Sequence, residues 1–258
     1  MKSWSSTASA DRIADPDPLK AQALPEDACT RQVIPDFRRT VFVQSAARLC
    51  DLKGISGAEV AFAGRSNSGK SSALNALCEQ RSLARTSRTP GRTRLINLFR
   101  LTDGQYLVDL PGYGYARVSE QQRRAWQTEL TRYLERRREL RGLIITMDIR
   151  HFLKPLDREL IDWAAQTRLR LLLLLTKADK LGAEAQARAR RESTLALQEF
   201  GVNATVQPFS APKRLGIDET RAWIWETLNA PREEAASLSP ATNPASDPAS
   251  DPVSNSGE

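Results

Sequence analysis

One octapeptide sets the fold class of this 258-residue chain: Gly64-Arg65-Ser66-Asn67-Ser68-Gly69-Lys70-Ser71. It fits the pattern G-x-x-x-x-G-K-[ST], in which backbone N–H groups wrap a phosphate, the lysine reaches the terminal phosphates and the hydroxyl binds Mg²⁺. Residues 59–63 before it alternate as a strand does, and residues 72–77 after it favour a helix. The loop therefore opens a helix, whose N-terminus attracts anions. The context predicts an α/β nucleotide-binding domain.

Composition bounds the class of protein. Lys and Arg number 38 against 31 Asp and Glu, a formal charge of +7 that favours contact with polyanions, although a merely solvated basic surface is the alternative. Three cysteines lack metal-binding spacing, as is typical of proteins in a reducing cytosol. The most apolar run, residues 169–175, is interrupted by Arg170 and is far too short to span a bilayer. We expect a cytoplasmic protein without a membrane span.

The chain divides into three parts by composition. Residues 1–32 are rich in Ser, Ala, Asp and Pro and lack apolar periodicity, so we expect a disordered arm. Residues 231–258 contain an immediate repeat of Ala-Ser-Asp-Pro, which is typical of a low-complexity tail. The folded unit is expected to be one α/β domain, residues 33–230.

Within that domain the elements alternate. Strands are expected at residues 95–101 and 105–110, a hairpin joined by Asp103-Gly104, and at 142–148, 171–175 and 205–209. Helices are expected from Ser119 to about Leu140, at 155–166 and 184–200, and from a cap at Asp218 to residue 229. Residues 33–48 are expected to lie on the domain without a defined element. The prediction is a mixed, mostly parallel six-stranded sheet with one antiparallel edge strand and helices on both faces.

Three further stretches indicate which nucleotide binds. An aspartate after a strand can hold Mg²⁺ through water, and the following glycine N–H can meet a terminal phosphate. An aspartate after a later strand can accept the N1–H and N2–H₂ donors of guanine, a pair that adenine lacks. A backbone N–H after the last strand can meet the guanine oxygen. These stretches are Asp109-Leu110-Pro111-Gly112, Thr176-Lys177-Ala178-Asp179 and Phe209-Ser210-Ala211.

The order of these motifs resembles the small GTP-binding proteins related to translation factors. The phosphate loop continuing to Asn75, residues 85–93 and residues 109–116 look more closely like the EngB family of bacterial ribosome-biogenesis GTPases, over about residues 42–228. The resemblance implies a Ras-like GTPase domain of the P-loop NTPase class. It also implies GTP hydrolysis coupled to assembly of the large ribosomal subunit, with loss of the protein disturbing cell division and septation.

The resemblance assigns roles to individual residues. Lys70 neutralises the β and γ phosphates. Ser71 and Thr93 ligate Mg²⁺ directly, and Asp109 holds it through water. Asp109 and Gly112 together form the second switch. Lys70, Thr93 and Gly112 are the catalytic candidates. Thr93 lies within the first switch, Gly91-Arg92-Thr93-Arg94-Leu95, where Arg94 replaces the usual Gln. Thr176 stands where the general GTPase pattern has Asn, as is common in this family.

Hydrolysis is expected to be slow and to need stimulation, because Tyr113 stands where many GTPases carry a water-orienting glutamine. A partner or K⁺ would supply the missing acceleration. Asn67 is the candidate K⁺ ligand, since related GTPases with Asn there use it so, and a purely loop-shaping role is the alternative. His151, the single histidine, is expected to be structural.

The expected partners are the large-subunit precursor and its rRNA, bound by a monomer. Arginines of the first switch would contact the RNA when GTP orders that loop, although they equally fit a solvated loop: Arg85, Arg88, Arg92 and Arg94. Two other functions remain open. One is a P-loop ATPase or kinase of a small metabolite, which would need a further substrate site; the other is a septum-localised structural protein that only binds GTP.

Overall fold

The computed structural model describes residues 33–84, 95–113, 120–167, 169–202 and 204–231, with side chains left undescribed at 120–127. The predicted arm and nearly all of the predicted tail lie outside these ranges. So do Gly91, Arg92, Thr93 and Arg94 of the first switch and Ser119, the expected helix cap.

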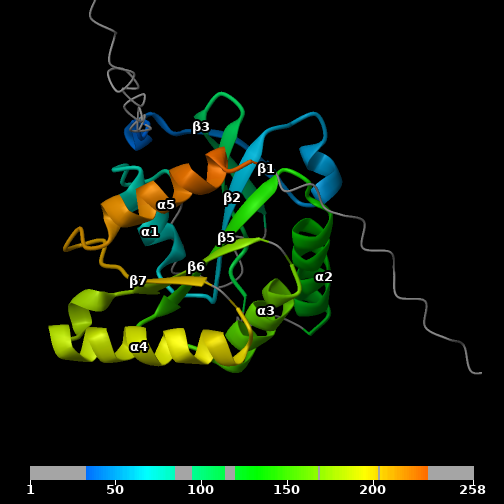
Figure 1. The fold of residues 1–258 in the computed structure, drawn as a ribbon. Helices are drawn as coiled ribbons and strands as arrows, with labels where there is room; N and C mark the ends of the chain where they lie inside the picture. Colours follow the sequence, from blue (N-terminus) through cyan, green and yellow to red (C-terminus); the bar gives the residue numbers. More distant parts are fainter. Residues whose placement is uncertain (1–32, 85–94, 114–119, 168, 203, 232–258) are drawn as a thin grey trace, which may run out of the picture. The chain divides into compact units, whose positions relative to one another are not determined.

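A single mixed sheet organises the domain (Figure 1). Its seven strands lie in the order β1-β3-β4-β2-β5-β6-β7. Strands β2, β4, β5, β6 and β7 run parallel, and β3 runs antiparallel to both β1 and β4. The bounds are β1 Val41–Ala46, β2 Ala58–Gly64, β3 Ile96–Thr102, β4 Gln105–Asp109, β5 Leu140–Asp148, β6 Arg170–Thr176 and β7 Ala204–Pro208.

The predicted fold class is confirmed, but the six-strand count and the position of the antiparallel strand are wrong. The extra strand is β1, which pairs with β3 and so moves the antiparallel strand one place in from the edge. The apolar triplet Val41-Phe42-Val43 begins β1 without alternating with polar residues, and all three side chains remain exposed. The period-2 signal by which strands are recognised is therefore missing there.

Helices cover both faces of the sheet, as predicted (Figure 1). Apolar side chains of α1 and α5 pack on one face, and those of α2, α3 and α4 on the other. Strand β6 shows the alternation directly, because Leu171, Leu173 and Leu175 join one core cluster whereas Leu172 and Leu174 join the opposite one. The bounds are α1 Lys70–Leu77, α2 Glu120–Arg136, α3 Pro155–Ala165, α4 Ala183–Glu199 and α5 Ile217–Asn229. No helix in the described ranges is both long and apolar enough to cross a bilayer.

Helix boundaries differ from expectation in two places. Asp218 is not the cap of α5; Gly216, with φ of 77°, occupies the cap position and Asp218 lies in the first helical turn. Leu140 belongs to β5 and not to the preceding helix, which ends at Arg136. The glycine expected to close α4, Gly201, does follow that helix, with φ of +69°.

A buried ionic cluster ties the end of α2 to the start of β2. The Glu59 carboxylate is fully buried and accepts hydrogen bonds from the Tyr133 hydroxyl at 2.7 Å and from Arg137 Nε at 3.0 Å. Arg137 also donates to the Ile55 carbonyl at 3.0 Å and pairs with Glu139 at 3.3 Å. This cluster lies at the edge of the sheet opposite to the carboxyl ends of the parallel strands.

Candidate functional site

The sequence motifs converge on one edge of the sheet. Parallel strands end at the same edge, and ligands of open α/β folds bind outside those carboxyl ends. The phosphate loop leaves β2, Asp109 ends β4, Asp148 ends β5 and Thr176 ends β6. Phe209 follows β7 directly. Residues far apart in the chain are thereby brought to one site.

Glycine is required at two positions of the phosphate loop. Gly69 has φ of +91° at the cap of α1, and a Cβ there would lie 3.0 Å from the Thr176 hydroxyl oxygen. A Cβ on Gly64 would lie 2.1 Å from Thr146 Oγ1 and 2.9 Å from the Thr146 carbonyl oxygen. The loop is thus pressed closely against β5 and β6, which fixes its curvature.

Hydroxyl groups support the loop from the sheet side. Ser68 Oγ and Thr146 Oγ1 lie 2.6 Å apart, and Thr146 donates to the Ala63 carbonyl at 3.1 Å. The Thr176 hydroxyl donates to the Ser68 carbonyl and also lies 3.0 Å from the Met147 carbonyl oxygen. Thr176 therefore braces the loop directly.

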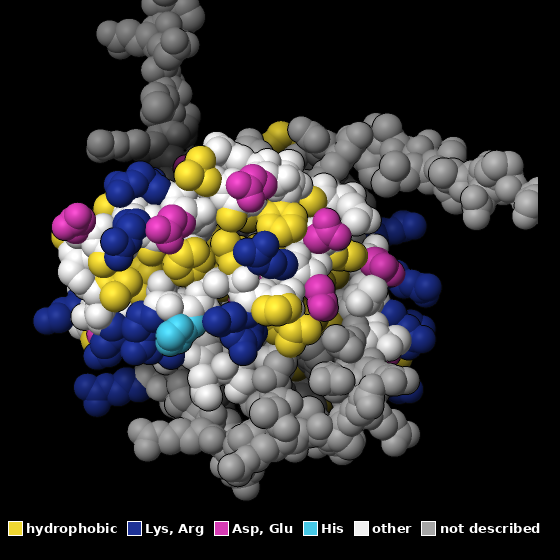
Figure 2. All heavy atoms as spheres, turned by 90° about the horizontal axis from the view of Figure 1, so that it is seen from below, with side chains coloured by type: hydrophobic (Ala, Val, Ile, Leu, Met, Phe, Trp, Pro, Cys, Tyr) yellow, Lys and Arg dark blue, Asp and Glu magenta, His cyan; other side chains and the backbone are white. Residues whose placement is uncertain are grey.

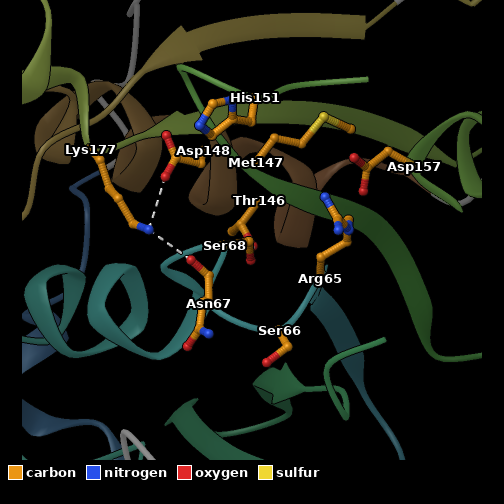
Figure 3. Close-up of a pocket in the computed structure, with 10 residues that line it drawn as sticks. All are labelled: Arg65, Ser66, Asn67, Ser68, Thr146, Met147, Asp148, His151, Asp157 and Lys177. Atoms are coloured by element: carbon orange, nitrogen blue, oxygen red, sulfur yellow. Dashed lines mark hydrogen bonds and ion pairs between the residues drawn. The ribbon is translucent and has the colours of Figure 1, made fainter. Parts of the chain in front are cut away.

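A lysine bridges the loop to β5. Lys177 Nζ donates to the Asn67 carbonyl at 2.8 Å and pairs with Asp148 Oδ2 at 2.9 Å (Figure 3). Asp148 also accepts two hydrogen bonds from the Arg150 side chain, at 3.0 and 2.7 Å. The Arg150 bonds, together with Lys177, hold the pKa of Asp148 far below its ordinary value. The carboxylate is therefore charged at any physiological pH.

The loop lysine and the second-switch aspartate form a buried ion pair. Lys70 Nζ contacts Asp109 Oδ1, and the two side chains are only 8% and 2% exposed. Ser71, the other phosphate-loop donor, lies partly buried in the first turn of α1. The Ser71 hydroxyl at the start of α1 and the Asp109 carboxylate at the end of β4 are oxygen donors of the kind that Mg²⁺ prefers. The donor set of the described residues therefore fits this metal.

The two loops predicted to read the base are joined. Ser210 Oγ donates to Asp179 Oδ1 at 2.7 Å, and the Ala178 N–H donates to the Phe209 carbonyl at 3.0 Å. The hydrogen bond from Ser210, with a second from Lys180, lowers the pKa of Asp179. Asp179 is thus a fixed, ionised acceptor.

The Tyr113 side chain is buried against α3. Its side chain is only 4% exposed, and its hydroxyl donates to Asp157 Oδ1 of α3 at 2.8 Å. Burial and the nearby carboxylate raise the pKa of Tyr113 well above 10. Burial likewise raises the pKa of Asp157, against the hydrogen bond from Tyr113. This tyrosine neither ionises nor points at solvent.

A cavity of about 190 Å³ lies between the loop and the β5–α3 connection. Ten residues line it (Figure 3): Arg65, Ser66, Asn67, Ser68, Thr146, Met147, Asp148, His151, Asp157 and Lys177. The single histidine, His151, lies exposed on its rim with Lys and Arg side chains beside it (Figure 2).

The predicted site residues that the structure describes lie at this edge of the sheet, but the residues that support them were not predicted. Thr146 and Asp148 were missed although both are polar residues at the end of an apolar strand, which is a usable signal. Asp157 was missed because nothing in a helical sequence marks it as a partner of the second switch. Leu95, the last predicted residue of the first switch, is 39% exposed just before β3.

Comparisons with known proteins agree with this geometry. A family model described as 50S ribosome-binding GTPase matches residues 59–177. The chain is similar to proteins named "Probable GTP-binding protein EngB" from Salmonella paratyphi C and Salmonella typhimurium, each 52% identical over 204 residues that cover 77% of this chain and 96% of the relative.

Solved structures share the fold. A crystal structure of a probable GTP-binding protein EngB has a TM-score of 0.55 at 20% identity and covers 66% of this chain and 98% of its own. Era from Aquifex aeolicus, solved as a variant bound to GDP and AlF4⁻, has a TM-score of 0.53 at 22% identity, covering 69% of this chain and 58% of its own.

Proposed function

This chain belongs to the EngB family of GTP-binding GTPases, and from that premise we propose that it is a nucleotide switch for assembly of the large ribosomal subunit, needed for normal cell division and septation. The observation that carries the choice of nucleotide is the joined pair of base loops, with Asp179 fixed by Ser210 at 2.7 Å. The description of the matching family model as a 50S ribosome-binding GTPase supports the choice of the large subunit as partner.

Guanine is read by charge and by hydrogen bonding in this proposal. The ionised Asp179 carboxylate accepts the N1–H and N2–H₂ donors of guanine, and the backbone of Phe209-Ser210-Ala211 meets the guanine oxygen. Adenine would leave the carboxylate unpaired, because it lacks that pair of donors. The lowered pKa of Asp179 supports this role, since only the ionised form accepts both bonds.

The phosphates are held by the loop and by Lys70. Ser71, Thr93 and, through water, Asp109 would hold Mg²⁺, which when bound neutralises charge on the β and γ phosphates. The buried position of Lys70 beside Asp109 keeps its ammonium group next to the site where phosphate oxygens would enter. The Gly112 N–H would meet the terminal phosphate. Lys70, Thr93 and Gly112 are thus proposed as the catalytic residues.

Intrinsic hydrolysis is proposed to be slow. Tyr113 is committed to Asp157 by its hydroxyl and does not orient water. Supplied transition-state charge can accelerate GTP hydrolysis by about 10³–10⁵. A ribosomal partner, or K⁺ bound with the help of the exposed Asn67, would supply it. Equal hydrolysis rates in KCl and NaCl would exclude the cation.

The remaining parts of the proposal concern the partner and the domain. In this proposal residues 33–230 are the GTPase domain of a cytoplasmic monomer. The first-switch arginines at 85, 88, 92 and 94 contact rRNA of the subunit precursor. Such binding must weaken steeply with salt, because arginines release counterions from phosphates.

Two measurements on the full chain test the function. Equilibrium binding should favour GDP over ADP by more than about 100-fold, and Asp179→Asn should abolish that preference while leaving the fold intact. Co-sedimentation with large subunits should occur with a GTP analogue and fall in GDP and at high salt. Tight ADP binding would indicate an ATPase or kinase instead. Co-sedimentation with large subunits that does not depend on GTP would refute the proposed role as a nucleotide switch.

A further inference from the structure

Tyr113 fastens the second switch to the phosphate loop through its backbone. Its N–H donates to the Gly64 carbonyl at 3.2 Å, and its carbonyl accepts the Ser66 N–H at 2.8 Å. Upstream, the Leu110 N–H donates to the Phe62 carbonyl at 3.0 Å. Residues 110–113 therefore continue the line of β4 alongside β2, and Gly112 is held between two of these contacts.

The side chain of Tyr113 adds a third attachment, to α3. Its buried hydroxyl donates to Asp157 Oδ1 at 2.8 Å. Asp157 is itself only 1% exposed, and its second oxygen accepts the Lys154 N–H at 3.0 Å at the start of α3. The carboxylate is fixed from both sides, so the phenol ring has one position relative to the helix.

We propose that the Tyr113–Asp157 hydrogen bond is a positioning device for GTP hydrolysis, which holds the Gly112 N–H against the phosphate loop where the terminal phosphate reacts. The inference rests on the proposed function and deepens it. Tyr113 touches no reacting atom and passes no proton. It acts because a donor that is already in place stabilises the transition state without reorganisation, and a displacement of about 1 Å can lower a rate about 100-fold.

The chain contains a matched control for this bond. Tyr133 is likewise fully buried, and its hydroxyl donates to the buried carboxylate of Glu59 at 2.7 Å. Glu59 lies five residues before Gly64 on the same strand, or about 17 Å along it. Tyr133→Phe therefore removes the same kind of bond at the edge remote from the nucleotide.

The experiment compares GTP turnover by the full chain and its variants, with active sites counted by bound nucleotide. Tyr113→Phe should lower kcat about tenfold and change KM and the Kd for GDP by less than about twofold. Tyr133→Phe should lower Tm by about as much as Tyr113→Phe does, but it should leave kcat unchanged. Asp157→Leu also removes the bond from the Lys154 N–H, but it should lower kcat as Tyr113→Phe does. Combining the two should lower kcat no further, because both remove the same Tyr113–Asp157 bond.

A conservative variant separates positioning from packing. In Asp157→Asn the amide oxygen can accept the Lys154 N–H while the amide N–H donates to the Tyr113 oxygen, so the contact survives with its direction reversed. Asp157→Asn should therefore keep kcat within about threefold of the wild type.

Each result that contradicts these expectations has a distinct meaning. If Tyr113→Phe turns over GTP as fast as Tyr133→Phe, the positioning role is wrong. The same holds if kcat and GDP affinity fall together, since the damage is then general. If the wild-type chain binds GDP but does not hydrolyse GTP under any condition, the proposed GTPase function fails instead.

Discussion

Replacing Glu59 by glutamine should destabilise the domain strongly without touching the nucleotide site. The Glu59 carboxylate is fully buried and is bonded by Tyr133 and Arg137, whose side chain is only 7% exposed. Glu59→Gln keeps the shape of the side chain but removes its charge. The guanidinium of Arg137 is then left buried with one remaining ionic partner, Glu139, at 3.3 Å.

The size of the effect follows from that geometry. Breaking a buried ion pair by removing one partner costs about 3–5 kcal/mol. Glu139 still offsets part of the charge of Arg137, so we expect the lower end, about 3 kcal/mol. For a domain of 150–250 residues, each kcal/mol lowers Tm by about 2–4 °C, which gives a fall of about 6–12 °C.

Urea and thermal unfolding of the full chain measure this prediction, with GDP binding as a second readout that should not change. Glu139→Gln is the control, because that carboxylate is 24% exposed and its ion pair is worth less than about 1 kcal/mol. Glu59→Leu combined with Arg137→Met and Tyr133→Phe should recover most of the loss, since it leaves neither a buried charge nor an unpaired buried hydroxyl. The reasoning is refuted if Glu59→Gln and Glu139→Gln are equally mild.

Three further predictions concern the nucleotide edge. Hydrogen bonds from Arg150 depress the pKa of Asp148, so the ionised carboxylate stabilises the fold above its unfolded pKa of about 4, and this stabilisation is lost as pH falls. Urea unfolding between pH 5 and 2 should therefore show a loss of about 1 kcal/mol in the free energy of unfolding that Asp148→Asn does not show. Thr176→Val removes the hydroxyl that braces the phosphate loop and should weaken GDP binding about tenfold in a fluorescence titration, with the Tm little changed. Gly64→Ala places a methyl group 2.1 Å from a side-chain oxygen of β5 and should abolish folding or GDP binding, whereas Gly182→Ala, with nothing within 4 Å of its Cβ, should be silent by both measures.

Local pattern was enough to predict most of the fold. Local residue patterns predict three kinds of segment: the phosphate loop, the Asp103-Gly104 hairpin and the buried apolar strands. In each case a few neighbouring residues contain either the glycines that the turn needs or the hydrophobic pattern of the strand. Strand β1 was not predictable in this way, because its pairing with β3 joins residues 50 to 59 positions apart and four of its six side chains stay exposed. The cap of α5 was missed because Asp218 is the stronger local signal, whereas Gly216 adopts the positive φ that the preceding turn requires.

The residues of the candidate site likewise differ in how well the sequence predicts them. The residues proposed to face the nucleotide occur in contiguous motifs, so the sequence is enough to propose them and to predict that they lie at one edge of the sheet. Their supports are single residues on other strands and helices, such as Thr146 behind the loop and Asp157 beneath the second switch. A contact made by one ordinary residue leaves no pattern in the chain, and only the fold reveals it.

The two outer strands of the sheet have a consequence for the solubility of the protein. The unpaired backbone groups of an edge strand can pair with a strand of a second chain, and a high protein concentration during expression or storage favours this pairing. Here β1 breaks its ladder with an irregularity between Phe42 and Gln44, and β7 ends at Pro208, whose nitrogen carries no hydrogen to donate. Both outer strands thus resist extension, even though β1 leaves Val41, Phe42 and Val43 in contact with water. Addition of a second chain at either edge of the sheet, and with it growth into fibres, is therefore disfavoured.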